Sequence, residues 1–164
     1  MGESSGGGIA AAVAMLVEER GGPALLAQIV DAPTVDDRLA TASMIQFTDI
    51  PGWRAKDAPY SWGYYLTGTA SPGDDQVSHT AVPARATLED LSGLPPAYVV
   101  AYEVDLTRDE AIDYARHLME AGVHTDLRVY EGASHLSHLF PGTAIGRRML
   151  DDRLSAITGL LNIE

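Results

Sequence analysis

Three side chains in this sequence could together perform acyl transfer: a serine, an aspartate and a histidine. Ser4 lies in Gly2-Glu3-Ser4-Ser5-Gly6, which fits the G-x-S-x-G pattern of a nucleophile elbow, a sharp strand-to-helix turn that exposes a serine. We expect the flanking glycines Gly2 and Gly6 because side chains there would collide across so tight a turn. Such a serine needs a base to take its proton and a carboxylate to orient that base.

The residues that follow the turn argue for structure at this end of the chain. A stretch rich in glycine and serine is also typical of a disordered tail, but Ile9–Glu19 is a strong helix former that ends at Arg20-Gly21-Gly22-Pro23. We therefore expect Ser5 to begin a helix whose first amides face the reaction centre, with the Ser5 amide as an oxyanion donor.

The carboxylate is expected after a buried strand. Ala97–Tyr102 is a β-rich run that ends where acidic residues begin, and Asp105 follows it on the chain. Glu103 and Asp109 compete for the role, and Asp105 could instead serve only to start the next helix.

The base is expected after the next strand. Thr125–Tyr130 alternates as a strand does, and His135 and His138 both follow it, whereas His117 and His124 lie on or just after a predicted helix. Spacing alone leaves the role open between His135 and His138. In either case the chain order serine, aspartate, histidine is that of an α/β-hydrolase triad.

The elements that must position these residues alternate between helix and strand, which is typical of an α/β fold with parallel strands flanked by helices. The predicted strands and helices are Leu25–Ala32, Ala97–Tyr102 and Thr125–Tyr130, and Ile9–Glu19, 106–121 and 143–161. In such sheets ligands bind at the carboxyl ends of the strands. We treat residues 1–164 as one catalytic domain.

Residues 39–91 form a predicted excursion of loops and short helices, over Thr41–Phe47 and Asp57–Leu66. Asp57 is a candidate N-cap, and we expect the aromatic residues of the second helix to pack beneath the excursion. Those residues are Trp62, Tyr64 and Tyr65. Just before the excursion, Asp37 and Arg38 are expected to pair locally or to form a solvated cluster.

Composition narrows the functional classes. The 164 residues carry a formal net charge of −12, which disfavours nucleic acid and anionic membranes as partners and leaves neutral esters as natural substrates. The chain has no cysteine, no long apolar run and no basic-then-apolar leader, so we expect no disulfide, no membrane span and a cytoplasmic location. No metal cluster or phosphate loop is recognisable, and we expect neither metal nor cofactor.

The turn and the helix after it resemble the hormone-sensitive-lipase-like carboxylesterases, or family IV, of the α/β-hydrolase fold. The stretch GESSGGGIA is similar to the family's GDSAGGNLA, with Glu3, Ser5 and Gly8 in place of aspartate, alanine and asparagine. The stretch AYEVDLTRDE resembles E-x-D-P-L-R-D-E, which selects Asp105. VYEGASHLSHLF resembles VYPGxxHGF, which selects His135 and places Leu136 where glycine is usual.

This resemblance implies a serine carboxylesterase for short-chain neutral esters, with Ser4 as nucleophile, Asp105 as the orienting carboxylate and His135 as base. Ser78–Arg85 resembles the family's SPxxAPxR loop, so His79 is expected on a surface loop. The family's cap, first strands and His-Gly-Gly segment precede the elbow and have no counterpart here. We therefore expect a partial fold of three strands with an open sheet edge, and a homo-oligomer.

Two alternatives follow from that open edge and from the family's other uses. One is an inactive or weakly active hydrolase fragment that self-associates through the edge. The other is a descendant of the fold that binds a small ligand.

Overall fold

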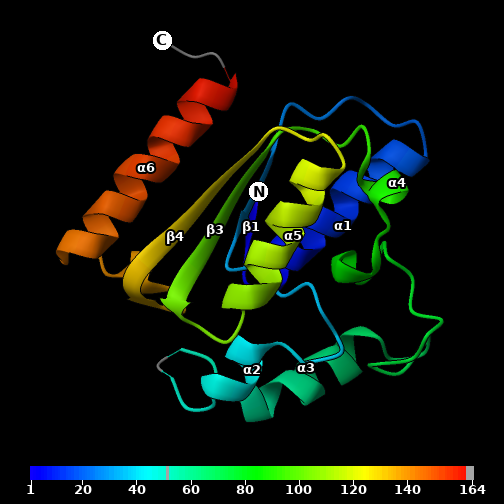
Figure 1. Ribbon diagram of the computed structural model, residues 1–164, viewed down its shortest axis with the longest axis horizontal. Helices are drawn as coiled ribbons and strands as arrows, with labels where there is room; N and C mark the ends of the chain where they lie inside the picture. Colours follow the sequence, from blue (N-terminus) through cyan, green and yellow to red (C-terminus); the bar gives the residue numbers. More distant parts are fainter. Residues whose placement is uncertain (51, 162–164) are drawn as a thin grey trace.

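A four-stranded parallel sheet forms the centre of the computed structural model, which describes residues 1–50 and 52–161 (Figure 1). The strands lie in the order β1-β2-β3-β4. Their bounds are Gly2–Glu3, Gln28–Asp31, Ala97–Val104 and Thr125–Ser134. The expected α/β class is confirmed, and the sheet has one strand more than the three expected, because the two residues before Ser4 pair with β2.

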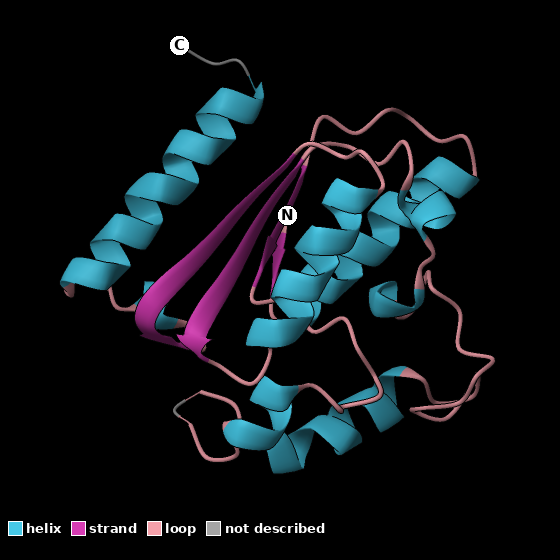
Figure 2. Ribbon diagram, viewed as in Figure 1, coloured by secondary structure: helices cyan, strands magenta, loops and turns pink. Residues whose placement is uncertain are grey.

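Helices cover both faces of this sheet (Figure 2). On one face lie α1, α4 and α5; on the other face, within the described residues, lies α6 alone (Figure 1). These helices are Ser5–Glu19, Leu88–Leu91, Arg108–Glu120 and Ala144–Leu161. No helix in the described part of the chain is long and apolar enough to cross a membrane.

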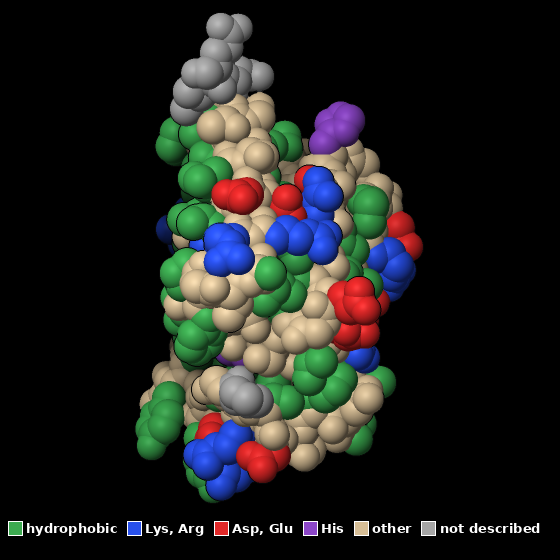
Figure 3. Space-filling model, turned by 90° about the vertical axis from the view of Figure 1, so that its left-hand side faces the viewer, with side chains coloured by type: hydrophobic (Ala, Val, Ile, Leu, Met, Phe, Trp, Pro, Cys, Tyr) green, Lys and Arg blue, Asp and Glu red, His purple; other side chains and the backbone are tan. Residues whose placement is uncertain are grey.

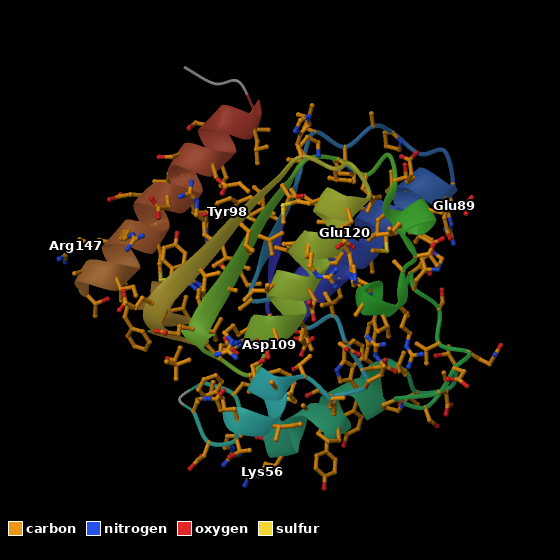
Figure 4. All side chains as sticks on the ribbon, in the orientation of Figure 1. Lys56, Glu89, Tyr98, Asp109, Glu120 and Arg147 are labelled. Carbon is orange, nitrogen blue, oxygen red and sulfur yellow. The ribbon has the colours of Figure 1, made fainter. Side chains whose placement is uncertain are left out.

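Two apolar clusters fill the two sides of the sheet. The first packs α1 and α5 onto inward-facing residues of β2 and β3, such as Val30 and Val99. The second lies under α6, where Tyr98 points from β3 toward the helix and packs with Met149 (Figure 4). Alternate residues of one strand therefore serve opposite cores, as a strand buried on both faces requires.

The excursion packs against the carboxyl ends of the strands (Figure 1). It contains α2, Ala42–Gln46, and α3, Ala58–Tyr65, together with short 3-10 turns at Ala55–Asp57 and Pro83–Arg85. Thr41 caps α2 by accepting a hydrogen bond from the Met44 amide at 3.3 Å. Ser43 in α2 joins the excursion to the end of β3, because its hydroxyl donates to the Leu106 carbonyl at 2.8 Å.

The local expectations for the excursion and its entry hold only in part. Asp57 occupies the N-cap position of α3, but its side chain makes no capping hydrogen bond and pairs with Arg54 instead. Tyr64 is 82% exposed and packs beneath nothing, whereas Trp62 is buried as expected. Asp37 pairs with Arg85 at 2.9 Å and Arg38 with Asp36 at 2.7 Å, so the two neighbours do not pair with each other and Asp37 is buried.

Glycine permits two close backbone approaches around Ser4. A Cβ atom at Gly2 would lie 1.9 Å from the Gly6 carbonyl oxygen, and one at Gly8 would lie 2.1 Å from the Thr34 carbonyl oxygen. A Cβ atom at Gly6 would meet nothing within 4 Å. The expected steric need for glycine therefore holds at Gly2 and is wrong at Gly6, while Gly8 meets a need that the sequence did not reveal.

We predict that Gly8→Ala lowers the free energy of unfolding by about 1–3 kcal/mol, because backbone atoms must move to admit the methyl group. Gly6→Ala is the matched control in the same helical turn, and we expect it to be neutral or stabilising by up to about 1 kcal/mol. Urea denaturation of both variants measures the difference. Equal stabilities would contradict the close approach at Gly8.

Candidate active site

The backbone at Ser4 takes the conformation of a sharp turn between β1 and α1. Its φ of 53° and ψ of −125° place a non-glycine residue at positive φ, which surrounding contacts must stabilise. Two hydrogen bonds do so: the Ser4 amide donates to the Asp31 carbonyl at 2.8 Å, and the Thr34 amide donates to the Ser4 carbonyl at 3.1 Å. The end of β2 therefore fixes the turn from both sides.

Ser4, His135 and Asp105 form one hydrogen-bonded chain. His135 Nε2 lies 2.9 Å from Ser4 Oγ, and His135 Nδ1 lies 2.7 Å from Asp105 Oδ2. A carboxylate only accepts, so a neutral imidazole donates its Nδ1–H to Asp105 and presents Nε2 as an acceptor to the serine hydroxyl. Asp105 is 0% exposed and His135 is 4% exposed, so solvent competes little with these contacts.

Thr107 holds the Asp105 carboxylate in place. Oδ1, the oxygen that does not contact His135, accepts from the Thr107 amide at 2.9 Å and lies 3.2 Å from the Thr107 hydroxyl. The competing carboxylates contact other groups: Glu103 accepts from the Gly132 amide, and Asp109, at the start of α5, accepts from Ser43 and Arg108 (Figure 4). Of the three acidic candidates, the structure brings Asp105 to the histidine.

The loop after β4 carries His135 in a strained turn. Leu136 has a φ of 61°, in the left-handed region that favours glycine and costs other residues about 1 kcal/mol. Here leucine occupies the position where the resembling family has glycine, and its side chain lines the cavity beside Ser4. The Trp53 ring, 5.9 Å from the His135 ring, packs on the base from the excursion.

The remaining histidines make other contacts. His138 contacts Tyr102 and Glu3. His79, which lies on a loop as expected, contacts Glu19 at the end of α1. His117 lies beside Arg116, and His124 is exposed. The choice that spacing left open therefore has a geometric answer, since His135 reaches Ser4 and His138 does not.

A cavity of about 380 Å³ opens above Ser4, within the usual size range of small-molecule sites. Its walls are mostly apolar and include Ile9, Trp62 and Tyr65, so part of the excursion lines it. Ser5 also borders the cavity at the first position of α1, where backbone amides lack partners within the helix. The N-terminus of α1 therefore borders the cavity beside Ser4.

The comparison with known families agrees with this geometry. A family model described as "alpha/beta hydrolase fold" matches residues 1–139, which include the turn, the carboxylate and the histidine. The chain belongs to the α/β-hydrolase family. The expected resemblance to carboxylesterases of this fold is thereby confirmed.

This chain is similar to several proteins that are named as esterases. It is 36% identical over 128 residues to "Carboxylesterase NlhH" of Mycobacterium tuberculosis, covering 77% of this chain and 39% of that protein. A solved "Bacterial Heroin Esterase" superposes with a TM-score of 0.92 at 41% identity, covering 98% of this chain and 50% of that one. Esterase LipW from Mycobacterium marinum gives a TM-score of 0.86 at 31% identity, with 98% and 48% coverage. The chain thus spans half or less of each of these relatives.

Glu110 is a buried residue of this site region that no sequence pattern singled out. One carboxylate oxygen accepts from the Val35 and Asp36 amides at 2.8 and 2.9 Å, and so secures the loop that holds Ser4 through Thr34. The other oxygen is buried and has no hydrogen-bond partner among the described residues. Burial raises the pKa of Glu110 to about 8, against the lowering effect of the two amides. No local pattern announces this contact, which joins residues 75 apart in sequence.

Among the described residues, one group of three side chains could hold a metal ion. Donor atoms of Glu3, Asp31 and His138 lie within 4.8 Å of one another. Each of these side chains already contacts Arg153 or Tyr102. We therefore assign this group to an internal hydrogen-bond network.

Because the pKa of Glu110 is raised, the folded chain keeps a proton on this side chain between about pH 4.5 and 8, whereas the unfolded chain has released it. Stability should therefore fall as pH rises through this window, by up to about 1.4 kcal/mol per pH unit. We predict that Glu110→Gln, which keeps an acceptor for both amides, makes the fall of stability with pH less steep by the contribution of about one proton, because glutamine does not titrate. Urea denaturation across the window measures it, and equal slopes would contradict the prediction.

Proposed function

We propose that this chain supplies the catalytic residues of a serine carboxylesterase. The observation that carries the proposal is the hydrogen-bonded chain Ser4–His135–Asp105, with distances of 2.9 and 2.7 Å, at the mouth of an apolar cavity. Names of the relatives support ester hydrolysis in general, and the geometry supports the assignment of roles to individual residues.

The proposed reaction has two halves. His135 Nε2 takes the proton from Ser4 as Oγ attacks the ester carbonyl carbon, and Asp105 stabilises the imidazolium that forms. The imidazolium then protonates the leaving alcohol, and an acyl group remains on Ser4. A water molecule then attacks the acyl carbon and gives a proton to the same His135 nitrogen. The bond to Ser4 Oγ breaks, the imidazolium returns the proton to Oγ, and the acid is released.

The Ser5 amide is the proposed oxyanion donor of this chain. The negative charge on the carbonyl oxygen would develop toward the first turn of α1, where the helix dipole also favours it. Loss of one donor from an oxyanion hole costs on the order of 10² to 10³ in rate. We therefore expect residues 1–164 to turn over ester slowly when no further donor is supplied.

The proposed substrates are short-chain neutral esters. Apolar and aromatic walls favour uncharged groups, and the net charge of −12 disfavours anionic ones. The same protein is proposed to act in the cytoplasm without metal or cofactor.

A fluorophosphonate probe tests the nucleophile. We expect stoichiometric labelling of the purified chain, none with Ser4→Ala, and a fall on the order of 10⁴-fold or more in rate with His135→Ala. His124→Ala, which changes an exposed histidine outside the cavity, is the matched control and should label normally.

A folded sample that does not label would contradict the esterase proposal. If it also formed concentration-dependent oligomers, the self-associating alternative would be favoured, because β1 lies at an edge of the sheet. Binding of a small ester that survives in Ser4→Ala, with no labelling of the wild type, would favour a ligand-binding protein.

Ester chain length tests the substrate class. With p-nitrophenyl esters, we expect kcat/KM to be highest for acetate to butyrate and to fall for acyl chains that exceed the cavity of about 380 Å³. Trp62→Ala should enlarge the cavity and extend the accepted length. Rates that rise steadily up to long acyl chains in the wild type would contradict the prediction.

A further inference from the structure

A second hydrogen-bonded group lies next to the Ser4–His135–Asp105 chain, and we call it the His138 network. Its members come from four strands or loops and from α6: Glu3, Asp31, Tyr102, His138 and Arg153. His138 Nε2 lies 3.1 Å from Glu3 Oε2, and His138 Nδ1 lies 2.9 Å from the Tyr102 hydroxyl. The Tyr102 hydroxyl also lies 2.5 Å from Asp31 Oδ1, and Arg153 pairs with both carboxylates.

With Glu3 and Asp31 ionised, counting donors and acceptors assigns the protons of this network. Burial and the Asp31 charge raise the pKa of Tyr102, so its single hydroxyl proton stays bound and is donated to the Asp31 carboxylate. The Tyr102 oxygen must then accept from His138 Nδ1. Glu3 is a carboxylate and only accepts, so His138 Nε2 must also donate. Both ring nitrogens therefore carry protons.

The charges agree with that count. Glu3 and Asp31 contribute two negative charges, and Arg153 contributes one positive charge. A cationic His138 makes the partly buried group neutral, which avoids the cost of an unpaired buried charge. Partial burial raises the pKa of Glu3, but Arg153 and His138 outweigh this effect and hold it below its usual value.

Each catalytic side chain is next to a member of the network. Glu3 directly precedes Ser4, and Asp31 accepts the Ser4 amide through its backbone carbonyl. Tyr102 precedes Asp105 by three residues on the same strand end, and His138 follows His135 by three residues. The network thus joins the turn at Ser4 to the loop that carries the base.

We propose that His138 is a positioning residue, held as an imidazolium that ties the His135 loop to strand β1. Its catalytic consequence rests on the proposed esterase function; its protonation state does not. If the His138 ring were neutral, only one ring nitrogen could donate. The other nitrogen would then face an acceptor, the Tyr102 or the Glu3 oxygen, and that contact would be lost. The groups that face it from the packed elements are Glu3 of β1, Asp31 of β2, Tyr102 of β3 and Arg153 of α6.

Ring ¹⁵N NMR of the 164-residue chain at neutral pH tests the protonation state. We expect both His138 nitrogens to be protonated, and we expect Glu3→Gln, which removes one negative charge, to favour the neutral ring. The low-field Nδ1–H proton of His135 should shift in His138→Gln. His124→Gln, at an exposed position, is the matched control and should leave that proton unchanged.

A competing arrangement places the proton on Asp31, whose pKa burial raises, and leaves His138 neutral. An unprotonated Nδ1 on His138 would establish that arrangement and overturn the proposal. So would a His135 proton that is unaffected by both Glu3→Gln and His138→Gln.

The rate of fluorophosphonate labelling tests the catalytic consequence. We expect His138→Gln to label on the order of ten- to a hundred-fold more slowly than wild type, because a small displacement of the base is costly. Equal rates would overturn the positioning role. Absence of labelling in the wild type, with the NMR result as expected, would instead count against the esterase function alone.

Discussion

The site depends on how closely two backbone segments approach each other. The turn at Ser4 and the loop after β2 touch where Gly8 meets the Thr34 carbonyl, a contact that leaves no room for a Cβ atom. This approach lets the Thr34 amide bond the Ser4 carbonyl, which holds the serine at its positive φ. It also aims the first turn of α1 at the cavity. Glu110 fastens the same loop from α5, so a buried side chain far along the sequence supports the turn at Ser4 without contacting it.

Sequence patterns predicted the regular parts of this structure well. Hydrophobic runs and helix stops located β2, β3, β4, α1 and α5 to within a few residues, because local propensity and tertiary packing favour the same conformation there. The two-residue β1 escaped prediction because so short a strand is defined only by its partner. The turn pattern selected Ser4, but spacing left Glu103 and Asp109 open beside Asp105 and His138 open beside His135. Only the family motifs selected Asp105 and His135.

What the sequence left undetermined involves contacts between distant residues. The pairing of Asp37 with Arg85 spans 48 residues, and local charge patterns suggested Arg38 as the partner instead. The contacts that distinguish the two histidines are made to Asp105 and Tyr102 at the end of β3, which the histidines reach only when β3 and β4 pair. The left-handed turn at Leu136 contradicts its residue type, so propensity could not indicate it. Such departures from local preference include the turns at Ser4 and Leu136, which lie on either side of the contact between Ser4 and His135.

Helix α6 gives the molecule an uneven architecture. It covers its face of the sheet within the described residues, and its outer surface shows apolar side chains among charged ones (Figure 3). Its exposed leucines include Leu150 and Leu154. Through Arg153, α6 also contacts the carboxylate of Glu3, the residue before Ser4. A helix with one packed side and an exposed outer side is a natural unit of local unfolding. Partial opening of α6 would expose the tyrosines beneath it and withdraw Arg153, so amide exchange in this helix would be thermodynamically linked to order at Ser4.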